Sequence, residues 1–173
     1  MSPRRIVLVG FMGAGKSTIG RALARHLEWT FVDLDTRIEK RTGHTVPELF
    51  EMRGEAGFRD IEWQAAAALR TLDRHVIAAG GGAFAQRATR AELTSGAATV
   101  YLRCTLETVL ARVGDGHGRP LATNRETITG LYLERETSYR LAEFTIDTDD
   151  GSPQALAVRV ADLVLGKTPP GAR

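Results

Sequence analysis

A phosphate-binding pattern occupies residues Gly10–Ser17, where GFMGAGKS fits G-x-x-x-x-G-K-[ST] between an apolar run and a helical pattern. In such a loop the backbone N–H groups converge on phosphate oxygens, and the following helix adds the positive end of its dipole. We expect Lys16 to contact the β- and γ-phosphates of a nucleotide and the Ser17 hydroxyl to ligate Mg²⁺. A tight strand-to-helix turn would explain the glycines, but it would not explain the Lys16-Ser17 pair.

Two carboxylates follow in the stretch VDLD, where Asp33 and Asp35 alternate along a predicted strand. Near the carboxyl end of this strand both can reach the phosphate loop. One can order the water molecules around Mg²⁺ while the other accepts a proton from an attacking hydroxyl group. The alternative is a polar strand exit in which Asp35 caps a helix that begins at Thr36.

Two further segments contain groups suited to an anionic substrate. In FRDIE, Arg59 stands early in a predicted helical turn, where a cation opposes the helix dipole and an anionic partner is therefore indicated. Glu62 lies three residues later and can orient the guanidinium, although a surface ion pair worth less than about 1 kcal/mol is the plainer interpretation. The run Gly80–Gly82 ends an apolar strand and lets a ligand approach backbone N–H groups, unless it is only a loose loop.

A glycine-rich segment separates two helical patterns at VGDGHGRPLA, residues 113–122. It is typical of a mobile lid, which we place at about 113–124, and Arg119 within it can neutralise charge on a transferring phosphoryl group. An ordinary loop is the alternative, and His117 is interpreted as a solvated loop residue. Arg140, late in a helix, is by itself an ordinary cation at a helix C-terminus.

These segments need an alternating α/β framework to bring them together. Strands are expected at 6–9, 29–35, from 75 into the glycines at 80–82, at 98–104 and at 144–148, and helices at 17–27, 36–41, 46–72 with a break near Gly54 and Gly57, 105–113, 126–143 and 153–165. This alternation predicts one domain over 1–173 with a parallel sheet covered by helices on both faces. Ligands of such sheets bind at the carboxyl ends of the strands, which is where the polar and glycine-rich segments fall.

Composition narrows the function classes. The 173 residues contain 23 basic and 21 acidic side chains, and a net charge of +2 gives no support for a nucleic-acid-binding protein. The single cysteine, Cys104, excludes an intrachain disulfide framework and is expected to be a small packing residue. The apolar run before Gly10 is too short for a signal peptide, and nothing approaches a membrane span, so we expect a cytoplasmic protein with no membrane partner.

Taken together, the motifs resemble the shikimate kinase family. The resemblance rests on GFMGAGKST, DLD at 33–35, FRDIE at 58–62, GGG at 80–82, GRPLA at 118–122 and YR at 139–140, in an order and spacing that match over about residues 4–165. It implies a P-loop three-layer α/β/α fold with a five-stranded parallel sheet in the order 2-3-1-4-5, a substrate-binding region at about 34–60 and the lid. It also implies ATP and Mg²⁺ as cofactors, shikimate as the substrate, whose 3-hydroxyl receives the γ-phosphate of ATP, and a monomer.

The resemblance carries roles to individual positions. Lys16, Asp35 and Arg119 would be catalytic, with Asp35 holding the 3-hydroxyl as the candidate base. The ATP-binding set would be Gly13, Ala14, Gly15, Lys16, Ser17, Thr18, Arg112, Arg119 and Pro120, with the loop 150–153 near the base. The substrate-binding set would be Asp35, Arg59, Gly80, Gly81, Gly82 and Arg140, with both arginines on the carboxylate and Glu62 orienting Arg59. Ser17 would ligate the metal directly and Asp33 through water.

One departure and two rival functions accompany the resemblance. The family usually reads R-P-L-L where this chain has Ala122 after Leu121, which bears on the packing of the lid and leaves Arg119 in place. A kinase for another small polyol acid such as gluconate would use the same scaffold. A nucleotide-binding regulatory module without catalysis is the alternative from another class, although the guanine-reading N-K-x-D motif of GTPases is absent and Asp35 and Arg59 are both present.

Overall fold

Five strands form one parallel sheet in the order β2-β3-β1-β4-β5, which confirms the predicted topology. The computed structural model describes residues 3–113 and 124–166. The strands are β1 (Arg5–Val9), β2 (Thr30–Asp33), β3 (His75–Ala78), β4 (Ala98–Arg103) and β5 (Phe144–Asp147). The helices are α1 (Lys16–Leu27), α2 (Leu34–Thr42), α3 (Val46–Ala67), α4 (Arg87–Thr94), α5 (Leu106–Val113), α6 (Arg125–Tyr139) and α7 (Pro153–Leu165).

The central strand β1 is buried along its whole length, as expected of a parallel strand covered on both faces. Its Val7 lies between Ile77 of β3 and Thr99 of β4 in the sheet register. The strand also buries a cation, because Arg5 donates through Nη1 to the carbonyl of Leu69 at 2.7 Å and through Nη2 to the carbonyl of Ser95. These two bonds tie β1 to the segments that follow α3 and α4.

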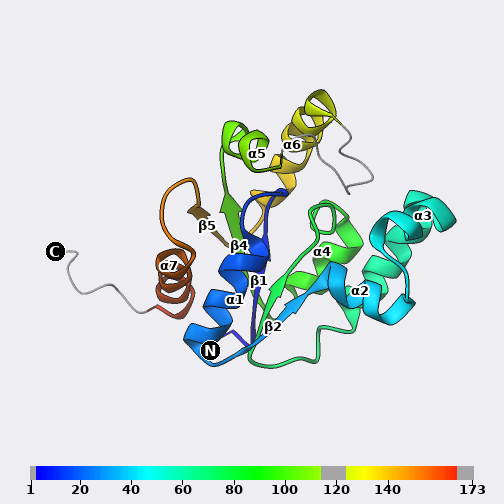
Figure 1. Cartoon of the computed structure of the whole chain (residues 1–173). Coiled ribbons are helices and arrows are strands. Elements are labelled where there is room, and N and C mark those ends of the chain that lie inside the picture. The colour runs from blue at the N-terminus through cyan, green and yellow to red at the C-terminus, as the bar shows by residue number, and fades with distance from the viewer. Residues whose placement is uncertain (1–2, 114–123, 167–173) are drawn as a thin grey trace.

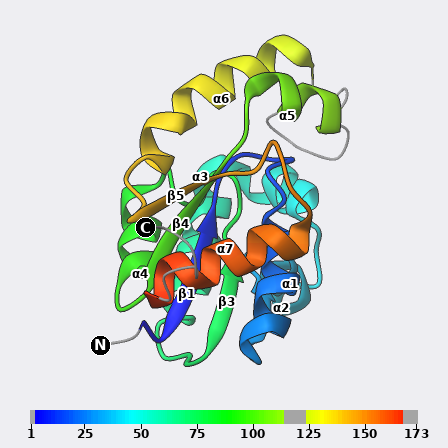
Figure 2. The same cartoon turned by 90° about the vertical axis from the view of Figure 1, so that its left-hand side faces the viewer.

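Helices cover both faces of the sheet and give three layers (Figure 1). The helices α1 and α7 pack against each other on one face, and Figure 2 shows α7 crossing in front of the strands with α1 next to it. The helices α3 and α4 pack together on the opposite face, with α2 against α3. The loops that leave the carboxyl ends of β1, β2 and β3 therefore open at the same edge of the sheet, where parallel α/β folds bind ligands.

Three local features differ from the sequence-based expectation. The strand β2 ends at Asp33 and α2 begins at Leu34, so Asp35 lies in the first turn of a helix and not on the strand. The helix α4 was not expected, and α6 ends at Tyr139, before the predicted boundary. The predicted break in the long helix is present at Gly54, whose φ of 67° and ψ of 178° interrupt α3.

The remaining sequence-based inferences concern single residues and long helices. Cys104 is buried, and burial raises the pKa of its thiol, which agrees with a packing role. Within residues 3–113 and 124–166, no helix combines the length and the apolar composition needed to cross a bilayer. The predicted lid, with Arg119, Pro120 and Ala122, lies outside the described residues.

Candidate active site

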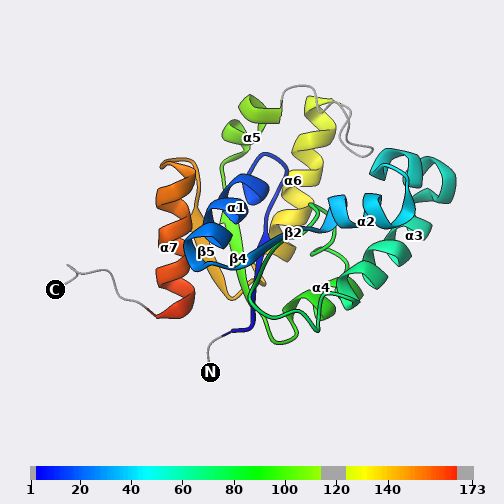
Figure 3. The ribbon, with the colours of Figure 1, turned by 60° about the horizontal axis from the view of Figure 1, so that its bottom comes forward.

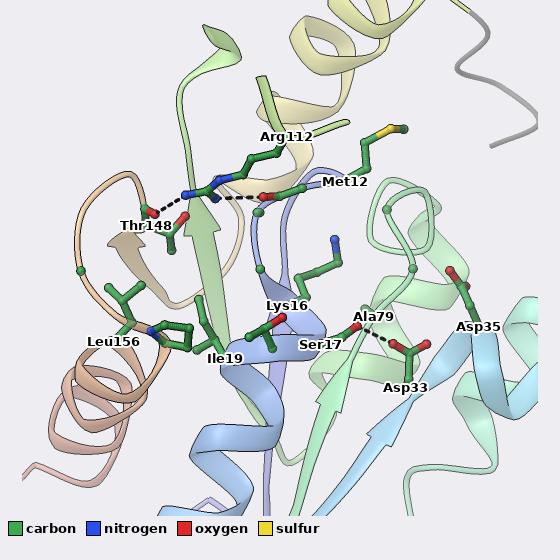
Figure 4. A pocket seen from close by; sticks show the side chains of 18 residues that line it. Met12, Lys16, Ser17, Ile19, Asp33, Asp35, Ala79, Arg112, Thr148 and Leu156 are labelled. Carbon is green, nitrogen blue, oxygen red and sulfur yellow. Dashed lines mark hydrogen bonds between the residues drawn. The ribbon is translucent and has the colours of Figure 1, made fainter. Parts of the chain in front are cut away.

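A cavity of about 470 Å³ lies at the carboxyl edge of the sheet and collects most of the predicted site residues. Its lining includes every residue from Met12 to Ile19, Asp33 at the end of β2, Asp35 in the first turn of α2, Gly80 and Gly81 after β3, and Arg112 from α5. Figure 4 shows Lys16 at the base of this cavity, with Arg112 toward one end and Asp35 toward the other. A volume of this size suits a small-molecule ligand.

The glycines of the phosphate loop are required by its geometry. Gly10 has φ of 144°, and a Cβ there would lie 2.6 Å from the carbonyl oxygen of Leu102. Gly15 also has a positive φ, 91°, and directly precedes α1. The loop therefore turns sharply enough to aim the N-terminus of α1 at the cavity, and Lys16 donates from Nζ to the carbonyls of Gly10 and Phe11, each at 2.8 Å.

Asp33 connects the phosphate loop to α2. Its Oδ2 accepts a hydrogen bond from the Ser17 hydroxyl at 2.7 Å, and its Oδ1 accepts one from the backbone N–H of Thr36 at 3.2 Å. The second bond makes Asp33, rather than Asp35, the N-cap of the helix. A hydroxyl and a carboxylate in contact are hard oxygen donors of the kind that Mg²⁺ prefers when substrate phosphates and water complete its coordination. Among the described residues, no group of three or more acidic, histidine or cysteine side chains is placed to hold a metal alone.

Arg59 lies against the glycine run and is held by two carboxylates. Its Nη1 donates to Glu62 at 2.9 Å and its Nη2 to Glu55 at 3.1 Å, while its side chain is only 14% exposed. Burial raises the pKa of Glu62, an effect that the adjacent guanidinium partly opposes. The Nε of Arg59 is buried and has no hydrogen-bond partner in the part of the chain that the structure describes. A buried donor in this condition indicates a missing acceptor such as a ligand or a water molecule.

The glycine run itself is closely packed by functional side chains. A Cβ on Gly80 would lie 2.6 Å from Oδ1 of Asp35, and a Cβ on Gly82 would lie 2.6 Å from Nη2 of Arg59. Neither glycine has a positive φ, so the absence of a side chain here serves to leave space rather than to permit a turn. The run thereby brings backbone N–H groups, a carboxylate and a guanidinium to one wall of the site.

Arg140 is not brought together with this group, unlike the other residues of the predicted substrate-binding set. It stands at the C-cap of α6, its side chain is 66% exposed, and it pairs with Glu136 on its own helix at 2.9 Å. Arg135, on the same helix, lies beside the glycine run instead. Arg135 is 7% exposed, and its Nη1 would lie 3.5 Å from a Cβ on Gly81.

The contacts of Tyr139 explain the position of Arg135. The Tyr139 hydroxyl donates to the carbonyl of Gly81, and its ring packs against Tyr101 of β4 with the centroids 5.4 Å apart. Residues four apart lie on the same face of a helix, so a buried Tyr139 turns Arg135 inward and the neighbouring Arg140 away. An aromatic residue with a polar tip was thus the available marker of the buried face of α6.

Arg112 lies at the end of the cavity away from Asp35 (Figure 4). It donates to the carbonyls of Gly13, at 2.9 Å, and Thr148, at 3.2 Å, and so links the phosphate loop to the segment after β5. Gly151 and Pro153 of the loop expected near the base also line the cavity, together with Leu156, which had not been singled out.

Comparison with known proteins gives a consistent result. A family model described as shikimate kinase matches residues 12–164. The chain is 43% identical over 164 residues to a shikimate kinase of Moorella thermoacetica (94% of this chain, 95% of that protein) and 40% identical over 171 residues to one of Pseudomonas entomophila (96% and 99%). The structure of a shikimate kinase from Acinetobacter baumannii in complex with shikimate superposes with a TM-score of 0.91 at 38% identity and covers 98% of this chain and 96% of that one.

Proposed function

The chain belongs to the shikimate kinase family, and we propose that it transfers the γ-phosphate of ATP to the 3-hydroxyl of shikimate, releasing ADP and shikimate 3-phosphate. The observation that carries the proposal is the convergence of the half-buried Arg59 and the buried Arg135 on a glycine run that faces Asp35 across from the phosphate loop. The arginines suit a carboxylate, because a guanidinium offers it two parallel N–H donors.

The donor half of the site positions ATP. Backbone N–H groups at the start of α1 and the Lys16 ammonium hold the phosphate oxygens, and Arg112 lies toward the nucleoside. Ser17 would hold Mg²⁺ directly and Asp33 through water, and the ion would neutralise charge on the β- and γ-phosphate oxygens. Phosphoryl transfer depends mainly on positioning and charge neutralisation, and so the site requires no covalent nucleophile.

The acceptor half holds and activates the hydroxyl. Arg59 and Arg135 grip the substrate carboxylate, Glu62 keeps Arg59 in place, and backbone groups of Gly80–Gly82 contact the remaining substrate oxygens. Asp35 accepts the hydroxyl proton as the oxygen forms its bond to the γ-phosphorus, and the bond to the bridging oxygen breaks so that its electron pair leaves with ADP. Arg119 and Pro120 remain assigned to ATP and the 113–124 segment to a lid, as the sequence analysis predicts.

An assay of ADP release tests the proposal. The rate measured with ATP and Mg²⁺ should rise sharply on addition of shikimate and not on addition of gluconate, which separates a shikimate kinase from a kinase for another polyol acid and from a nucleotide-binding regulatory module. Asp35→Asn should abolish this stimulation while the affinity for ADP stays within about twofold of the original. Stimulation at an undiminished rate in that variant would refute the role of Asp35. The monomeric and cytoplasmic state expected of the family stays a prediction, and sedimentation analysis tests the first part of it.

A further inference from the structure

A second cavity, of about 550 Å³, lies outside the active site along the edge of the sheet. It is formed between α1 and α2 over β2, which is an edge strand because only β3 pairs with it. Figure 3 shows β2 running between these two helices. We call this cavity the basic groove and define it by Arg21, Phe31, Asp33, Arg37, Lys40 and Arg41.

The basic groove concentrates positive charge that the protein does not neutralise. It holds four cations and one carboxylate, whereas the whole chain has a net charge of only +2. In the described parts of the chain none of the four cations forms an ion pair. Arg41 donates to the side-chain oxygen of Gln64 at 3.2 Å, and the guanidinium of Arg21 lies 5.1 Å from the centre of the Phe31 ring. Both contacts orient the charges without cancelling them.

Helix stability accounts for only part of this cluster. Lys40 and Arg41 are in the last turn of α2, where cations favour the helix dipole. Arg37 lies three and four residues before them, and like charges at that spacing repel each other. Arg21 comes from a different helix and closes the opposite wall. Charged side chains also protect the unpaired edge of a sheet from pairing with another chain. That role does not require the charges to surround one cavity with an aromatic wall, as these four cations do.

We propose that the basic groove binds a small phosphorylated anion, distinct from the nucleotide and substrate held in the active site. Three guanidinium groups and one ammonium group are the donors that proteins use for phosphate oxygens. The size of the groove suits a small metabolite, and its cations gather around one cavity rather than along an extended stripe of the kind that tracks a nucleic-acid backbone.

Asp33 couples the basic groove to the active site. Of the residues that the structure describes, it alone lines both cavities. Its two oxygens bond Ser17 of the phosphate loop and the N-terminus of α2, the helix that carries three of the four cations. An anion in the groove therefore attracts the cations of α2 and changes the electrostatic potential at Asp33. The affinity for nucleotide should change as a result. This coupling rests on the proposed function, whereas binding in the groove does not.

A calorimetric titration with inorganic pyrophosphate tests the binding. Because pyrophosphate also fits the phosphate loop, the protein is first saturated with ADP, and the ADP titration by itself reports on the proposed function. We expect one further equivalent of pyrophosphate to bind, with affinity reduced about tenfold or more in the double variant Arg37→Gln and Lys40→Gln. The matched control, Arg25→Gln with Arg159→Gln, removes the same charge from exposed positions outside the groove and should bind as the original protein does.

Each result decides the proposal. If no further equivalent binds, or if the control loses affinity as much as the groove variant, the groove is not a phosphate site. Tighter binding of a single-stranded oligonucleotide than of pyrophosphate would replace the proposed small ligand by a nucleic acid. If thermal unfolding shows that the double variant is destabilised, Arg21→Gln on the opposite wall serves instead. An ADP affinity that pyrophosphate leaves unchanged would refute the coupling through Asp33 and leave the binding site intact.

Discussion

The prediction that tests the geometry of the site most directly is Gly82→Ala. A Cβ at this position would lie 2.6, 2.8 and 3.0 Å from Nη2, Nη1 and Cζ of Arg59, whereas ordinary van der Waals contact begins at 3.4 Å. Alanine can adopt the backbone conformation of Gly82, because its φ is not positive. The methyl group must therefore displace the guanidinium by about 0.8 Å, the shortfall of the nearest contact.

The magnitude follows from what holds Arg59. Its bonds to Glu62 at 2.9 Å and to Glu55 at 3.1 Å fix the guanidinium, and a shift of this size misaligns it with these partners and with the substrate carboxylate. A hydrogen bond to a charged group contributes about 1.5–3 kcal/mol. At about 1.4 kcal/mol for each factor of ten, kcat/KM for shikimate should fall between about tenfold and a hundredfold. The loss should appear mainly in the KM for shikimate.

Initial-rate kinetics with each substrate varied in turn is the assay, and two other glycine variants complete the design. Gly80→Ala displaces the carboxylate of Asp35 instead, because its Cβ would lie 2.6 Å from Oδ1, and should lower kcat more than it raises KM. Gly130→Ala is the matched control in α6, where nothing lies within 4 Å of the added methyl group. It should leave the kinetics unchanged and raise the free energy of unfolding by about 0.4–1 kcal/mol. A Gly82→Ala enzyme whose KM for shikimate stays within twofold of the original, or rises no more than its KM for ATP, would refute the reasoning.

Three more predictions concern buried charge. Arg135→Ala should raise the KM for shikimate at least about tenfold while Arg140→Ala changes it less than twofold, since of the two only Arg135 is buried beside the glycine run. Equal effects in steady-state kinetics would favour the sequence-based assignment of Arg140 to the substrate. Burial raises the pKa of Glu62 above its ordinary value of 4.5, against the opposing pull of Arg59, so the folded protein binds this proton more tightly than the unfolded chain. The free energy of unfolding should therefore decrease as pH rises from 4.5 through the raised pKa, and Glu62→Gln should lose this decrease in urea denaturation. Arg5→Leu leaves two backbone carbonyls without their donor and should lower the free energy of unfolding by about 2–4 kcal/mol, with no change in either KM.

The framework was predictable because its signals are local and redundant. Buried parallel strands are continuous apolar runs, and the phosphate loop is specified by glycines that have no side-chain substitute at their φ values. The helix α4 was not predicted because its local signals are weak. It is eight residues long, its N-cap Gln86 makes no side-chain bond, and only Thr89 and Leu93 are buried. Two buried positions in eight residues are too few to establish a helical period.

Arg140 shows where local signals end. In the sequence, Arg140 directly follows Tyr139, and Arg135 precedes Tyr139 by four residues. On a helix of 3.6 residues per turn, the five-residue step from Arg135 to Arg140 separates them by about 140° around the axis. The burial of Tyr139 against Tyr101 therefore decides which arginine faces the glycine run, and no spacing within α6 reveals this contact with β4.

The paired carboxylates show how a chemical inference can hold while its structural basis changes. Residues two apart on a strand point to the same face, so a strand through Asp33 and Asp35 would direct both carboxylates the same way. Because Asp33 caps α2 through the N–H of Thr36, the chain turns at Leu34, and both carboxylates line the cavity. The N-cap bond is thus what allows one carboxylate to contact Ser17 while the other faces the glycine run. Its strength should set the spacing between these two carboxylates, and through it an anion bound in the proposed basic groove would act on both.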